Sequence, residues 1–140
     1  MPTSIREQII DAILTAVGGT YTAVVPRDDA ELPICIVQDG EEEASPDDYN
    51  HLHRIMPVAV AKATVTSSTD LDAQRQECHE LLASIIEDMH ADETFGELAD
   101  GVDYTGGGIL AEPGNRCMAE AQFDVRYHTV RNDPYTIDEE

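Results

Sequence analysis

The sequence predicts an α+β domain in which two main helices pack on one face of a mostly antiparallel or mixed sheet of about four or five strands. Three observations predict this class. Apolar residues recur at helical spacing over residues 4–17 and again over 70–89, and they alternate with polar residues over 117–128. The predicted order is helix, two strands, long strand, long helix and two strands, which is typical of helices gathered against an antiparallel sheet.

The first helix is expected to begin at Ser4, because Ser4 and Glu7 have the spacing of a capping box. A Gly-Gly pair ends this helix. Two β-branched runs, 21–25 and 34–37, then predict two short strands joined by a turn. The next segment, 39–48, holds six acids in ten positions, so we expect a solvated and mobile loop there.

A long strand is expected over 55–66, and both of its faces are partly apolar. Met56, Val58 and Val60 share one face, while Ile55 and Ala59 lie on the other. A strand with two apolar faces lies centrally in its sheet or at an interface. We therefore consider the face of Met56, Val58 and Val60 a candidate contact surface.

The second helix is predicted from Thr69 and Asp72, which have the spacing of another capping box, and from a wide apolar stripe that follows them. A strand over 102–112 follows, and its Gly106-Gly107-Gly108 run indicates a bulge or a bend. The last strand, 117–128, should have one buried and one wet face. We expect residues 1–130 to form a single domain and residues 131–140 to form a flexible C-terminal tail.

The charge balance excludes several classes of partner. The chain has 29 acidic residues and 8 Lys or Arg, a formal charge of −21. Nucleic-acid backbones and anionic membranes are bound mainly through Lys and Arg, so we expect neither sequence-specific nucleic-acid binding nor membrane binding. No apolar run is long enough to span a bilayer, and residues 1–17 do not resemble a signal peptide. The acids indicate either adaptation to high salt or a basic partner.

The sequence contains no pattern typical of an enzyme, a cofactor site or a metal site. Three cysteines, Cys35, Cys78 and Cys117, lie far apart among apolar neighbours, so we expect buried, reduced thiols. Asp47, Asp48, His51 and His53 would be the best metal ligands, but their spacing matches no known motif, and a solvated loop leading into a strand is the favoured interpretation.

The chain as a whole resembles the tail terminator (tail completion, minor tail) proteins of long-tailed phages and viruses. The likeness covers residues 4–130 and lies in the order of segments and in local patterns, without a diagnostic motif. It includes the opening helix, Glu31 to Val37 leading into Gly40-Glu41-Glu42, the Asp70-Leu71-Asp72 helix opening, the link over residues 98–104 and the closing strand. The Asp133-Pro134-Tyr135-Thr136 ending is also similar to the tails of these proteins.

This resemblance implies a structural virion protein at the tail–neck junction, made in the host cytoplasm. Such a protein forms a homo-oligomeric ring, usually a hexamer, that caps the tail tube and ends its polymerisation. Its expected partners are itself, the tail tube protein and a neck or head-completion protein, and no catalytic residue carries over. Two alternatives remain open: another head–tail connector ring, such as an adaptor or stopper, and a small oligomeric α+β enzyme.

A closed ring needs two complementary patches on each subunit. We hypothesise that the Val-rich strand face supplies one patch, and that the acidic segment and the tail contact axial partners. Deleting residues 41–48 is then expected to leave the fold intact and weaken docking. The candidate partner contacts are Glu41, Glu42, Glu43, Asp47, Asp48, Met56, Val58, Val60, Arg126, Arg131, Asp133 and Tyr135.

Overall fold

The computed structural model describes residues 3–21, 34–46, 51–65, 70–112 and 116–137. It contains two helices and a six-stranded mixed sheet, which confirms the predicted α+β class. The elements, in chain order, are α1 (Ile5–Val17), β1 (Thr20–Tyr21), β2 (Ile34–Asp39), β3 (Glu43–Pro46), β4 (His51–Val65), α2 (Leu71–His90), β5 (Gly101–Glu112) and β6 (Arg116–Val130).

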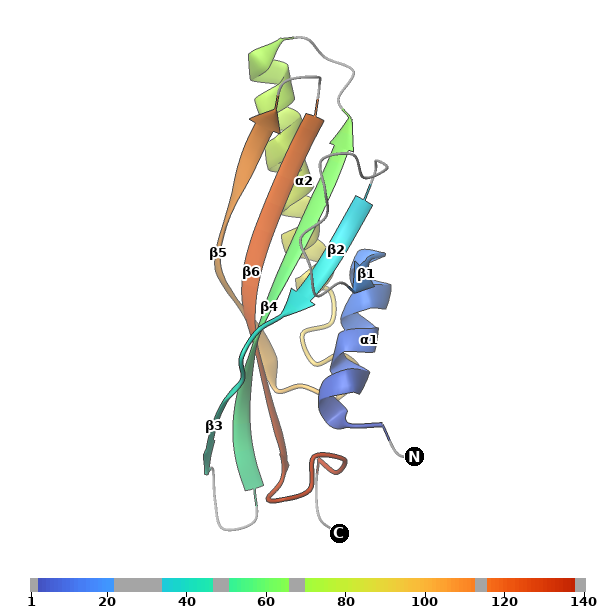
Figure 1. Cartoon of the computed structure of the whole chain (residues 1–140), viewed down its shortest axis with the longest axis vertical. Coiled ribbons are helices and arrows are strands. Elements are labelled where there is room, and N and C mark those ends of the chain that lie inside the picture. Colours follow the sequence, from blue (N-terminus) through green and yellow to red (C-terminus); the bar gives the residue numbers. More distant parts are fainter. Residues whose placement is uncertain (1–2, 22–33, 47–50, 66–69, 113–115, 138–140) are drawn as a thin grey trace.

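The sheet has the order β1-β2-β4-β6-β5, and β3 pairs with the first part of β4 (Figure 1). Only the short β1·β2 pair is parallel, and the other four pairs are antiparallel. β4 therefore lies in the centre of the sheet, as its two apolar faces predict. It begins at His51, four residues before the expected start at residue 55, and pairs with β6 along its whole length.

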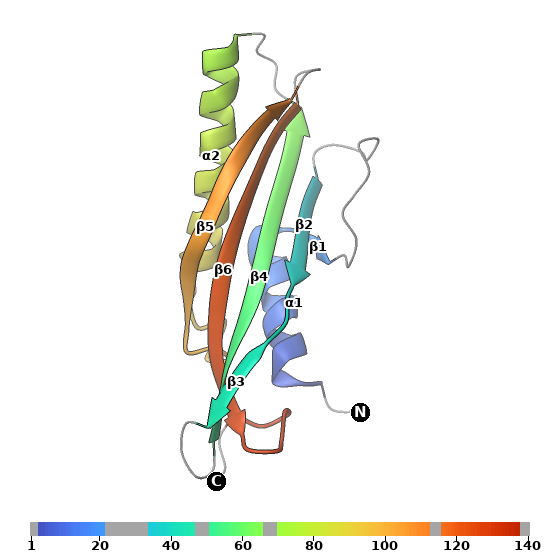
Figure 2. The ribbon, with the colours of Figure 1, turned by 60° about the vertical axis from the view of Figure 1, so that its left-hand side comes forward.

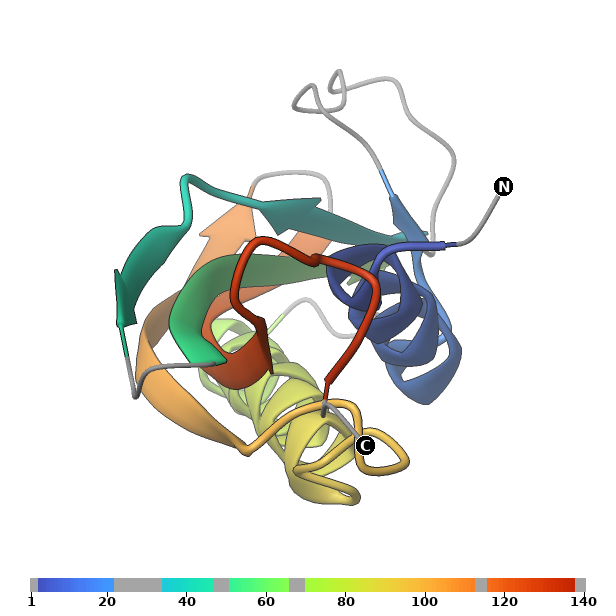
Figure 3. The same ribbon diagram turned by 90° about the horizontal axis from the view of Figure 1, so that it is seen from below.

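One face of the sheet carries the core. Met56 lies opposite Val125 and Val58 lies opposite Phe123, so these side chains share a face. They form one buried cluster with apolar side chains of both helices. Seen along the long axis, both helices lie inside the curve of the sheet, and Figure 2 shows α2 running beside β5 (Figures 2 and 3). The helix residues in this cluster include Ile9, Ile13, Ile85 and Met89.

The prediction that Met56, Val58 and Val60 form an outer contact face is wrong. Their exposed fractions are 0%, 2% and 0%, because they lie under the helices and fill the core. Both faces of β4 contain small or branched apolar residues, so the alternation along the strand did not indicate which face the helices cover.

The helix ends follow from local capping. The Ser4 hydroxyl accepts a hydrogen bond from the Glu7 amide at 3.1 Å, and Gly18 ends α1 in the left-handed conformation (φ 67°). In α2 the cap is Asp70, whose carboxylate accepts from the Asp72 amide, while the expected cap Thr69 lies outside the described residues. The capping side chain is therefore one residue later than predicted.

β5 and β6 are the two strands that the sequence predicts after the second helix, and they pair antiparallel. From Cys117 to Thr129 every second residue of β6 is buried, as the alternation indicates. The pairing of β5 with β6 shifts register between Tyr104 and Gly106, so the predicted irregularity lies at the start of the glycine run.

The described parts of the acidic segment and of the C-terminal segment pair or hydrogen-bond with the rest of the domain. Residues 43–46 form β3, so the described part of the acidic segment is an edge strand joined to β2 by a short link. After β6, the Ile5 amide donates to the Pro134 carbonyl at 3.0 Å and the Val130 amide donates to Thr136 at 2.7 Å. Ile137 packs against the core. Residues 131–137 thus lie against the start of α1.

The expectation of reduced thiols is corrected for two of the three cysteines. Cys78 of α2 and Cys117 of β6 are fully buried, as expected, but they form a disulfide that links the helix to the sheet. Cys35 of β2 is free and half-buried, and burial raises the pKa of its thiol. An odd number of widely spaced cysteines did not indicate this pairing, because the two lie 39 positions apart in the sequence.

Candidate interaction surface

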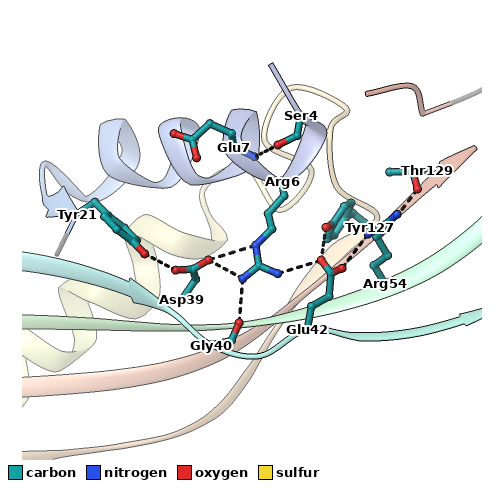
Figure 4. Close-up of polar contacts among 10 residues, drawn as sticks. All are labelled: Ser4, Arg6, Glu7, Tyr21, Asp39, Gly40, Glu42, Arg54, Tyr127 and Thr129. Carbon is teal, nitrogen blue, oxygen red and sulfur yellow. Dashed lines mark hydrogen bonds and ion pairs between the residues drawn. The ribbon is translucent and has the colours of Figure 1, made fainter. Parts of the chain in front are cut away.

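A network of charged side chains joins α1 to the sheet, and we call it the Arg6 clasp (Figure 4). Its members are Arg6 of α1, Asp39 at the end of β2, Glu42, Arg54 of β4 and Tyr127 of β6. Arg6 Nη2 donates to Asp39 Oδ2 at 2.5 Å and to the Gly40 carbonyl at 2.9 Å. The guanidinium therefore binds both a carboxylate and the backbone of the link that follows β2.

Glu42 lies at the centre of the clasp. Its Oε1 accepts from Arg6 Nη1 at 3.2 Å and also from the Tyr127 hydroxyl, while its Oε2 accepts from Arg54 Nη1 at 2.9 Å. Arg54 Nε in turn donates to the Thr129 hydroxyl at 3.0 Å. A carboxylate in an acidic run thus faces inward, because three donors from three elements satisfy it.

The clasp changes how its members titrate. Burial alone would raise the pKa of Asp39, but hydrogen bonds from Arg6 and Tyr21 outweigh it and hold that pKa below its usual value. Burial and the adjacent Glu42 carboxylate raise the pKa of Tyr127 well above its usual value of 10. The folded chain therefore favours the charged form of Asp39 and the neutral form of Tyr127.

These contacts give the Arg6 clasp a structural role. Its side chains are largely withdrawn from solvent and are bonded to one another, so no nucleophile or general base is presented to a substrate. The clasp fixes α1 and the β2–β3 link onto β4 and β6. It sets the position of the sheet edge that carries β3.

The opposite face of the sheet is the better candidate for an interaction surface, and we call it the open face. It is formed by the residues that alternate with the core residues of β4, β5 and β6. A hollow of about 430 Å³ lies over β5 and β6 on this face, between Gly106–Ile109 and the side chains of Glu120 and Gln122. The open face includes Ala59, Ala61, Gly106, Gly108, Glu120, Gln122 and Arg126.

The acidic contact candidates are divided by the structure. Glu41 and Glu43 are exposed, whereas Glu42 is held in the Arg6 clasp. Asp47 and Asp48 lie outside the described residues. Deleting 41–48 would remove Glu42 and β3 together, so we no longer expect that deletion to leave the fold intact.

The remaining contact candidates lie at one end of the sheet. Arg126 Nε pairs with Asp103 at 2.8 Å, and its guanidinium lies over Gly101 of β5. Arg131 and Tyr135 are exposed, while the Asp133 carboxylate accepts from the Tyr135 amide within the C-terminal turn. Arg126, Arg131 and Tyr135 therefore remain accessible, and Asp133 shapes the turn.

Neither a metal centre nor a membrane span is found in the described parts of the chain. No group of three or more His, Cys, Asp or Glu residues among the described residues could hold a metal ion. Of the four sequence candidates, His51 and His53 lie on β4, and the two aspartates are not described. No helix in the described ranges is long and apolar enough to cross a membrane.

Sequence reasoning missed the members of the Arg6 clasp other than Glu42. Arg6 and Asp39 are 33 positions apart, and nothing local marks them as partners. One signal was available: Arg6 and Arg54 are two of only 8 basic residues among 29 acids, so each is expected to have several carboxylates within reach.

No protein-family model and no curated protein matches the chain. Among solved structures, it is similar to a protein of the virion of a native gene transfer agent (GTA) particle. That protein is 13% identical, and the superposition has a TM-score of 0.38 over 88% of this chain and 90% of that chain. Similarity at this TM-score does not establish a common fold, so no functional conclusion follows from it.

Proposed function

We propose that the chain is a structural virion protein that forms a ring, caps the tail tube, ends its polymerisation and joins the tail to the neck. The single observation that carries the proposal is the open face of the sheet formed by the described strands. Apolar side chains of both helices share one core with the sheet face of Met56 and Val58, so the opposite face of the sheet is available to a partner. The sequence resemblance to tail terminators names the class of partner.

The proposed mechanism is capping by surface mimicry. One face of the ring reproduces the docking surface of a tube ring, and the other face lacks the surface that would template the next ring. The exposed residues Glu41, Glu43, Arg131 and Tyr135 are the candidates for axial contacts with the tube protein or the neck protein. The proposal assigns the chain to the tail–neck junction after synthesis in the host cytoplasm, and assigns it no enzymatic activity.

Tube length tests the proposal directly. Purified protein is added to polymerising tail-tube subunits, and tube lengths are measured by electron microscopy. A terminator shortens the mean tube length as its concentration rises and is found at tube ends. Unchanged lengths together with bare tube ends would reject the terminator role.

The alternatives are separated by assembly state and binding partner. A hexamer detected by native mass spectrometry would support a connector ring. A stable dimer or trimer would favour a small oligomeric enzyme. A ring that binds the portal or neck protein but leaves tube length unchanged would identify an adaptor or stopper instead.

A further inference from the structure

The Cys78–Cys117 disulfide closes a loop that contains the rest of α2 and the whole of β5. Cys78 lies in the first half of α2, and Cys117 lies near the start of β6, 39 positions later in the sequence. α2 packs against both β5 and β6, and Figure 2 shows it running beside β5. The crosslink therefore joins the two ends of one structural unit, which consists of α2 and the β5–β6 pair.

The two ends of β5 are held in different ways. Before its start, the Asp100 amide donates to the Arg126 carbonyl at 2.7 Å, and Arg126 Nε pairs with Asp103 at 2.8 Å. Near its end, Ala111 lies opposite Cys117, whose sulfur is bonded to α2. Polar contacts thus hold the start of β5 in any redox state. The attachment of its end to α2 depends on whether the two sulfurs are oxidised.

A second contact at the start of α2 does not need the crosslink. The Gln74 side chain is buried and donates to the Arg116 carbonyl at 3.1 Å. This bond keeps the helix beside the start of β6 when the sulfurs are reduced, so the two thiols stay neighbours and can react with each other. Cys35 does not compete with them, because it lies on β2 and β4 separates β2 from β6.

Both bonded sulfurs are closed to solvent. Cys78 and Cys117 are 0% exposed, and thiol–disulfide exchange requires direct contact between the reacting sulfurs. An external reagent can therefore reach the pair only when the start of α2 moves away from β6 in a local opening. The crosslink opposes that opening. The dithiol form should open more often than the disulfide form, so the pair should become oxidised faster than it is reduced again.

We propose that Cys78 and Cys117 form a redox-sensitive clamp, which is a dithiol when the chain is made and a disulfide after the particle has left the host. This inference rests on the proposed function, because a virion protein is made in a reducing cytoplasm and then leaves it. The clamp leaves the fold in place and fixes the far end of the α2–β5–β6 unit only outside the cell.

The oxidant of this step is a small-molecule disulfide. One protein thiolate attacks it, forms a mixed disulfide and releases one small thiol. The second protein thiolate then attacks the mixed disulfide, which forms the Cys78–Cys117 bond and releases the second small thiol. The protein loses two electrons to the oxidant, and its two thiol protons end on the two released thiols.

Hydrogen exchange at short labelling times tests whether the effect is local. We expect amides in residues 72–80 and 109–112 to exchange at least tenfold faster in the reduced full-length chain than in the oxidised one, and amides in 101–104 to exchange equally. Cys117→Ala should reproduce the reduced pattern. Cys35→Ala is the matched control and should keep the oxidised pattern. No change, or an equal increase along the whole chain, would overturn the inference.

Alkylation in denaturant at the moment of lysis tests the change of state. Mass spectrometry should find three labelled cysteines in the newly made intracellular chain and one, Cys35, in released particles. The same number of labels in both samples would overturn the inference. Dithiol chain treated with oxidised glutathione should also pass from three labels to one while folded, and failure to do so would overturn it as well. A clamp that passes these tests in a chain that leaves tube length unchanged would refute the proposed function alone.

Discussion

The Arg6 guanidinium of α1 lies 2.5 Å from the Asp39 carboxylate of β2, although 33 positions separate the two residues in the sequence. Because Arg6 also binds Glu42, one side chain holds the first helix, the end of β2 and the link to β3. The edge strand β3 is therefore positioned by a charged network that lies on the core side of the sheet.

Replacement of Arg6 by alanine is expected to destabilise the fold by about 2–3 kcal/mol, because it leaves two largely buried carboxylates with fewer donors. Chemical denaturation monitored by circular dichroism measures the change. Arg75→Ala is the control: its guanidinium is 63% exposed and lies 3.6 Å from Asp72, so its loss should cost at most about 0.5 kcal/mol. Equal effects of the two variants would contradict the role of the Arg6 clasp.

Asp39 should make the fold sensitive to acid. Its pKa is lower in the folded chain than the ordinary value of 3.8, so its charge stabilises the fold above that value. This contribution is lost as the pH falls through the folded pKa. We expect Asp39→Asn to be less stable than the wild type at pH 6 and to lose less stability between pH 5 and pH 3. Parallel pH profiles for the two proteins would show that Asp39 is not the group responsible.

Tyr127 should make the fold sensitive to base. Its pKa is raised in the folded chain, so stability is unaffected by this group below the ordinary value of 10 and falls as the pH rises above it. Tyr127→Phe is expected to cost about 1–2 kcal/mol at pH 7, through loss of the bond to Glu42. The variant should also lose less stability than the wild type as the pH rises above 10. Absorbance at 295 nm against pH reports the tyrosines that ionise, and a Tyr127 that titrates near 10 in the folded state would contradict this prediction.

The Cys78–Cys117 disulfide is expected to stabilise the fold by roughly 4 kcal/mol, because it closes a loop of about 40 residues in the unfolded chain. Alkylation followed by mass spectrometry of the denatured protein should label one cysteine before reduction and three after it. Cys35→Ala is the control, since it leaves the crosslink in place. Three labels without reduction would show that the two thiols are free.

Local patterns were enough to predict most of the fold. The alternation over 117–128 and the helical spacing over 70–89 identify β6 and α2. In a half-buried strand or helix, the residues that face the core recur at a fixed interval along the sequence. The burial of Val58 was not predictable in this way. Alternation divides a strand into two faces, and with apolar residues on both, the choice of face depends on helices that are distant in the sequence.

The Arg6 clasp depends on contacts that no local pattern carries. Glu42 is one of three consecutive glutamates, and only the direction of the backbone after β2 turns it toward Arg6 and Arg54. The glycine run of β5 was partly predictable. The sequence indicated an irregular strand there, and the register shift between Tyr104 and Gly106 confirms it.

The charge of −21 predicts a fold that is stabilised by salt. Repulsion among carboxylates opposes the compact state, and its range falls as the Debye length shortens from about 10 Å at 0.1 M to about 3 Å at 1 M. We expect the melting temperature to rise steadily as KCl increases across this range. The double variant Glu80→Gln, Glu87→Gln removes two exposed carboxylates from α2 and should reduce the slope. Contacts between acidic subunits should also weaken as the salt concentration falls, so dilution into low salt should dissociate any ring. Full stability below about 50 mM salt would contradict adaptation to salt and would leave a basic partner as the explanation of the charge.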